Sequence, residues 1–116
     1  MANTRSASDE ITVAVTSWAG VHAEPGDLGE LGFKVGRREI GHLHGDRAAH
    51  FSFPKKLWVE LREHGRIVPH PVFPDSPGLA ARRIANETDV RDVIALFRLN
   101  YDRAVARRIL NAKGEG

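Results

Sequence analysis

The sequence predicts an α+β domain of two layers, in which an antiparallel sheet of about 4–6 strands carries helices on one face. Three observations favour this class: apolar residues alternate with polar ones in mid-chain, tight-turn dipeptides separate these runs, and apolar residues recur at helical spacing near both ends. With 116 residues, the chain has room for one core. We expect that domain over residues 8–111, between a disordered tail at 1–7 and a flexible tail at 112–116.

The composition excludes several kinds of site. The chain holds no cysteine, which rules out disulfides, thiolate nucleophiles and cysteine-bound metals. Its apolar runs fall short of the ~18 residues of a membrane span, and no signal-peptide core follows Met1. We therefore expect a cytoplasmic protein with no membrane partner. The net charge is only +2 and aromatic residues are 7%, which is too little to indicate a nucleic-acid partner.

The N-terminal part of the chain predicts a helix. Ser8 is a good N-cap residue. Ile11, Val15 and Trp18 follow it at spacings of four and three, which is typical of one buried helical face. The β-branched residues within 11–13 leave a strand open as the alternative.

The middle of the chain predicts an antiparallel meander. Leu31, Phe33 and Val35 alternate with small or polar residues, as in a strand with one buried face. Gly36-Arg37 then suits a two-residue hairpin turn. Four prolines from Pro69 to Pro77 exclude regular structure from most of that segment. Strands are expected at residues 21–24, 31–35, 38–44 and 49–53, and one edge strand is expected at 79–85.

Two further helices are predicted after the meander. Pro54 suits the first turn of one helix, and Gly65 ends it. Its buried stripe consists of Leu57, Trp58 and Leu61. Asn86 or Thr88 caps the last helix, whose apolar stripe persists for about six turns. That stripe consists of Val90, Val93, Ile94, Phe97, Tyr101, Ala104, Val105 and Ile109.

Histidines on one predicted strand are the main candidates for chemistry. His42 and His44 alternate, so their side chains project from one face of the sheet about 6.8 Å apart. A two-residue turn at 45–46 sends His50 to the opposite face. A three-residue turn at 45–47 pairs His42 with His50 and brings all three together. The sequence leaves both registers open, because a slip of one residue reverses the faces.

Three interpretations of these histidines stay open: half-buried residues bonded to neighbours, a site that grips a substrate or transfers protons, and a metal site. A metal site would use His42 and His44 with either Asp46 or His50. Because two histidines without thiolates or an assured carboxylate form an incomplete site, we expect no cofactor and no tightly bound metal.

Other polar residues are candidates for substrate binding. Arg38 and Glu39 lie on the histidine strand and point to opposite faces. His70 lies in the proline-rich segment 69–78, whose prolines lower the entropic cost of ordering it. We expect this segment to run beside the strand histidines as one wall of a cleft.

The run Gly36-Arg37-Arg38-Glu39-Ile40-Gly41-His42-Leu43-His44-Gly45-Asp46 resembles the signature of the small bacterial luciferase-domain proteins, a family related to the core of fungal luciferase. The resemblance covers roughly residues 15–105. Supporting runs are Trp18-Ala19-Gly20-Val21, Phe51-Ser52-Phe53-Pro54-Lys55-Lys56, Leu61-Arg62-Glu63-His64-Gly65, Pro69-His70, Pro74-Asp75-Ser76 and Thr88-Asp89-Val90. The chain departs from the pattern at Pro77-Gly78-Leu79, where family members usually carry a tryptophan.

The resemblance implies a pocket for a small molecule. The fungal relative oxidises a hydroxylated pyrone with molecular oxygen and needs no metal or flavin. The resemblance makes Arg38, Glu39, His42, His44 and His70 candidates for this pocket. From the resemblance together with the residue patterns, we expect His42 and His44 as catalytic residues and Arg38, Glu39, His50, His70 and Asp75 as substrate-binding residues. The implied function is small-molecule binding or a cofactor-free, oxygenase-like reaction on an enolic or phenolic substrate with a histidine base.

Two alternatives to that function remain. One is a non-catalytic module that binds a ligand or a protein, and the other is a metal-dependent protein that uses the strand histidines. The sequence leaves open whether the protein is an enzyme and whether it forms a homo-oligomer.

Overall fold

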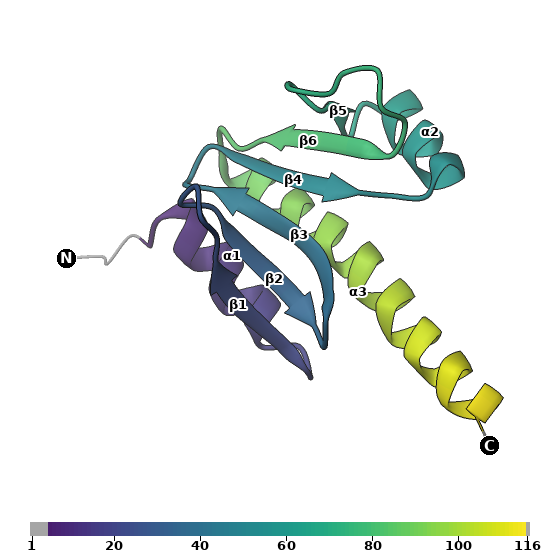
Figure 1. The fold of residues 1–116 in the computed structure, drawn as a ribbon. Helices are drawn as coiled ribbons and strands as arrows, with labels where there is room; N and C mark the ends of the chain where they lie inside the picture. Colours follow the sequence, from purple (N-terminus) through teal and green to yellow (C-terminus); the bar gives the residue numbers. More distant parts are fainter. Residues whose placement is uncertain (1–4, 116) are drawn as a thin grey trace.

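The computed structural model describes residues 5–115, and side chains as far as residue 110. The tails predicted at 1–7 and 112–116 fall partly outside these limits. Three helices and six strands make up the described residues (Figure 1). In chain order they are α1 (Ala7–Thr16), β1 (Val21–Pro25), β2 (Leu31–Val35), β3 (Arg38–His44), β4 (Ala48–Ser52), α2 (Lys55–Glu63), β5 (Val68–Pro69), β6 (Leu79–Arg83) and α3 (Glu87–Glu115).

The six strands form one sheet in the order β1-β2-β3-β4-β6-β5, and every neighbouring pair is antiparallel. Helices α1 and α3 lie together on one face of it (Figure 1). The predicted two-layer α+β class, with its long C-terminal helix, is confirmed. The two-residue turn at Gly36-Arg37 is present as well.

The core lies between the sheet and the two helices. Phe97 of α3 meets Phe33 of β2 and Phe51 of β4 edge to face, at ring-centroid distances of 5.1 and 4.9 Å. Ile11 and Val15 of α1 are fully buried beside them. Burial of this apolar surface is the main term that stabilises the helices against the sheet.

The observed ends of α1 and α3 differ in detail from the predicted ones. Helix α1 begins two residues earlier than expected, because Ser6 and not Ser8 is the N-cap: the Ser6 hydroxyl accepts the Asp9 amide at 3.1 Å. Asn86 is the residue that caps α3, with its Oδ1 accepting the Asp89 amide at 2.9 Å. Ile109, predicted in the buried stripe, is 51% exposed because α3 runs past the edge of the sheet (Figure 1).

Two predictions are corrected, one on the position of β6 in the sheet and one on the burial of α2. Strand β6 is an inner strand, not an edge, since the two-residue strand β5 pairs outside it. Pro69, which lacks an amide hydrogen, ends β5 and is tolerated at this outer position. In α2 only Leu61 is buried; Leu57 and Trp58 are partly buried, and the Trp58 indole donates to the Leu79 carbonyl at 3.0 Å.

The sheet divides between β3 and β4. These strands pair only from His42↔His50 to His44↔Ala48, and beyond that β4 continues against β6 (Figure 1). An irregularity in the β2–β3 pairing leaves Ile40 without a partner residue, which bends β3 away. Asn100 of α3 fills the gap, donating to the Ile40 and Ser52 carbonyls at 3.1 Å each.

Candidate functional site

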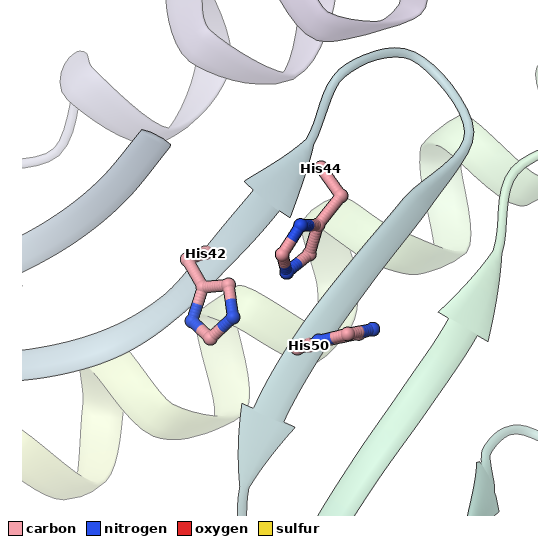
Figure 2. A group of neighbouring side chains, drawn as sticks. All are labelled: His42, His44 and His50. Carbon is pink, nitrogen blue, oxygen red and sulfur yellow. The ribbon is translucent and has the colours of Figure 1, made fainter. Parts of the chain in front are cut away.

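Three histidines face one another on the sheet surface opposite α1 and α3 (Figure 2). A three-residue turn, Gly45-Asp46-Arg47, joins β3 to β4, so His42 pairs with His50. The alternation of β3 places Leu43 in the core, 1% exposed, and His42 and His44 on the other side. The structure thereby selects the second of the two registers that the sequence left open.

Asp46 contributes to this register. Its Oδ1 accepts the amide of Ser8 in the first turn of α1 at 2.8 Å, which ties the turn to a helix 38 residues away in sequence. Gly45 adopts a left-handed conformation that suits a glycine. The Asp46 carboxylate is thus engaged at the helix terminus, and the clustered potential metal ligands are His42, His44 and His50.

The rings of the three histidines are close enough to share one ligand. Their centroids lie 4.9 Å (His42–His44), 5.3 Å (His42–His50) and 4.2 Å (His44–His50) apart. One nitrogen from each ring lies within 4.8 Å of the other two. Zinc–imidazole bonds are about 2.0–2.1 Å long, so the three nitrogens would have to move closer together by side-chain rotation to bind one ion.

The surroundings keep the inner histidines neutral. Burial, and then the neighbouring imidazoles, lower the pKa of His50 to about 4. Burial and His42 also lower the pKa of His44. Within the described part of the chain, the buried Nε2 of His44 has no hydrogen-bond partner. Such an orphan nitrogen is unusual, because leaving a buried polar atom unpaired costs about 1–3 kcal/mol.

Glu39 orients the outermost of the three rings. Its Oε2 lies 3.1 Å from Nδ1 of His42, three residues farther along β3. A carboxylate at Nδ1 favours the tautomer with the proton on that nitrogen, which leaves the lone pair on Nε2. Glu39, predicted as a substrate-binding residue, therefore contacts the histidine cluster directly.

His70 lies beside the cluster, where the proline-rich segment was predicted to pass. Its ring centroid is 4.5 Å from that of His50. Its Nδ1 accepts the amides of Val72 and Phe73, at 3.1 and 3.4 Å, so the ring proton is on Nε2. His70 therefore offers a donor to a ligand at the cluster.

The other predicted residues are farther from the histidines. Asp75 is exposed in the loop, and no hydrogen bond joins it to the four histidines in the described region. Arg38 is exposed at the start of β3. A hollow of about 410 Å³ reaches the cluster at His42 but does not include His44. It is lined by Glu24, Pro25, Gly26, Asp27, Leu28, Glu30, Gly32, Lys34, Glu39 and His42.

Sequence reasoning missed the β1–β2 contribution to this hollow. Glu24 and Lys34 form an ion pair at 3.0 Å on its wall. Neither residue belongs to a recognisable motif, and only the pairing of β1 with β2 places them near His42.

The sequence model of the luciferase domain matches residues 37–100, which is 64 of the 116 residues and includes the three clustered histidines and His70. The chain belongs to the luciferase-domain family. The predicted membership of the luciferase-domain family is therefore confirmed. Comparison with curated proteins and with solved structures finds no match. Among the described residues of this luciferase-domain protein, no helix is long and apolar enough to cross a membrane.

Proposed function

We propose that this luciferase-domain protein binds a divalent transition-metal ion through His42, His44 and His50 and acts on a small molecule there. The observation that carries the proposal is the set of three ring nitrogens within 4.8 Å of one another on one sheet face. Three imidazoles with an open position form a known type of catalytic metal site.

The proposal departs from the sequence-based expectation of no tightly bound metal. That expectation rested on two histidines forming an incomplete site. The three-residue turn adds His50 as a third ligand from β4. The geometry now favours the metal-dependent alternative, with His50 and not Asp46 completing the set.

The state of the rings supports metal binding. Metal ligands must be unprotonated, and the lowered pKa values of His44 and His50 mean that neither ring need lose a proton at neutral pH. A metal would also give the unpaired Nε2 of His44 a partner. Glu39 at Nδ1 of His42 matches the carboxylate–histidine arrangement that orients metal ligands.

The position of the cluster supports action on a small molecule. The three histidines are partly exposed on the face without α1 and α3, and His42 borders the hollow. An ion there would stabilise an enolate or phenolate oxygen, which is the substrate class that the family resemblance implies. His70, beside His50, would supply a hydrogen-bond donor to the same ligand.

Titration with Co²⁺ and Zn²⁺ tests the proposal, using chelator-treated protein without a polyhistidine tag. We expect one ion per chain and visible cobalt bands typical of low coordination. His50→Ala should abolish stoichiometric binding, and Glu39→Gln should weaken it about 10–100-fold. His64→Ala is the matched control, because His64 caps α2 away from the cluster.

Two results would refute the metal site. One is the absence of stoichiometric binding of either ion. The other is equal weakening by His64→Ala and His50→Ala.

A second candidate function is the cofactor-free reaction with a histidine base. The neutral state of His50 and His44 favours it, since a neutral imidazole accepts a proton from an enol or phenol. Oxygen consumption with such a substrate that persists undiminished in excess chelator would select this function over the metal-dependent one.

A further inference from the structure

We infer a second site, for the oxyanion group of a small molecule, a carboxylate or a phosphate. It is formed by Arg38 of β3 and by Arg103 and Arg107 of α3, together called the arginine cluster. These side chains line one hollow of about 350 Å³ where β3 and β4 diverge. The inference does not depend on the metal.

The hollow follows from the division of the sheet. Past His50, β4 is paired with β6 but no longer with β3. The Ile40 and Ser52 carbonyls on the two separated strands instead accept hydrogen bonds from the Asn100 side chain. Asn100 is 6% exposed and forms a fixed polar floor. The lining residues are Arg38, Glu39, Ile40, Ser52, Phe53, Pro54, Asn100, Arg103 and Arg107.

The charges in this hollow are unbalanced. Within residues 5–110, no carboxylate lies at ion-pair distance from the arginine cluster, whereas Arg66, Arg82 and Arg98 are each paired with an aspartate. Glu39 lines the hollow, but its Oε2 is bonded to His42. Arg103 donates to the Asn100 amide oxygen at 3.1 Å, which is a neutral partner.

The guanidinium groups are close enough to affect one another. Loss of solvent, and then the charges of Arg38 and Arg107, lower the pKa of Arg103. Arginine does not lose its proton in proteins, so the repulsion persists until an anion enters. Arg37 and Arg108 line an adjoining hollow and add to the positive field.

The shape of the site favours a small molecule over a nucleic acid. Its volume lies in the range of ligand pockets, roughly 300–1,000 Å³. Its floor is polar and buried, whereas nucleic-acid surfaces combine basic residues with exposed aromatic rings for stacking. Guanidinium groups bind carboxylate and phosphate oxygens in pairs, which suits one such group held between α3 and β3.

Calorimetric titration at low ionic strength tests the site, with pyrophosphate and citrate as probes. We expect saturable binding of at least one probe, and the tighter of the two identifies phosphate or carboxylate as the preferred group. The double variant Arg103→Gln/Arg107→Gln should weaken binding about tenfold or more. The single variant Arg107→Gln removes only one of the two charges and should show a smaller loss in the same direction.

The control is Arg91→Gln/Arg98→Gln, which removes the same charge from the same helix outside the hollow. Its affinity for the probes should stay within about twofold of the parent. Equal loss in both double variants would overturn the inference in favour of a general field effect. Saturable binding of a DNA duplex with none of either probe would overturn it in favour of a nucleic-acid surface.

Discussion

Gly41 shows how one residue brings the core and the site together. It precedes His42 on β3 and faces α3, and a Cβ atom there would come within 2.7 Å of Phe97 and 2.8 Å of Phe51. Both rings are buried and packed against each other, so neither can move away. The absence of a side chain at Gly41 lets these rings support the strand directly beneath the histidines.

We predict that Gly41→Ala lowers the free energy of unfolding by about 1–3 kcal/mol through overpacking. It should also weaken Co²⁺ binding, since any shift of β3 moves His42 relative to His50. Urea unfolding and cobalt titration measure the two effects. Gly45→Asn is the control: its Cβ would meet nothing, and asparagine tolerates the left-handed conformation. Equal stability of the two variants would contradict the packing argument.

Helix α3 has different roles along its length. Its first half packs across β3 and β2, with Val93, Leu96 and Phe97 fully buried. Its later turns supply Arg103 and Arg107 to the hollow beside β3 and then pass beyond the sheet, where Ile109 is exposed. One element therefore holds the core together and also supplies the proposed oxyanion site.

We predict that Phe97→Ala lowers the free energy of unfolding by about 3–5 kcal/mol, because it empties the centre of the core. Leu57→Ala should cost less, since Leu57 is only partly buried. His42→Ala should change stability little, because its ring is on the sheet surface. Thermal and urea unfolding give these differences, with Ile109→Ala as the matched control on α3. A loss for His42→Ala as large as for Phe97→Ala would make His42 a structural residue.

At the scale of the whole molecule, the two faces of the sheet are chemically distinct. One is covered by α1 and α3 and is apolar. The other carries the histidines, with the proline-rich segment beside them. An antiparallel sheet commonly leaves one face open to solvent, and residues on that face can be chosen for binding without disturbing the core. Because these histidines titrate, the free energy of unfolding of the whole protein should depend on pH.

We predict that the metal-free protein loses stability as the pH falls from about 6.5 to about 4. The folded pKa of His50 lies below its usual value of 6.5, so in this window the unfolded chain binds more protons and acid favours unfolding. His44 adds to the effect in the same direction, because burial and the neighbouring His42 lower its pKa as well. The imidazoles that face the His50 ring are those of His42, His44 and His70. Allowing for solvent screening, the loss should be about 1–3 kcal/mol.

Urea unfolding at successive pH values in the presence of chelator measures this loss. His50→Gln should flatten the pH dependence, and His64→Gln should leave it unchanged. A stability that is constant from pH 7 to pH 4 in the parent protein would contradict the prediction.

Local patterns determined much of the fold and part of the site. The alternation in β2 and β3, the Gly36-Arg37 turn and the helical stripes depend on neighbours within a few residues, so they can be predicted from the sequence. The same period of two placed His42 and His44 on one face. The family also followed from the sequence, because its motif is a continuous run.

The tertiary structure alone decided what depends on distant contacts. The length of the 45–47 turn, and with it the face of His50, involves the bond from Asp46 to α1, which no local pattern contains. The inner position of β6 required β5, a strand too short to be recognised. The arginine cluster exists only where α3 crosses the diverging strands. Register and the approach of separate elements follow from packing over the whole chain, and a linear pattern does not carry that information.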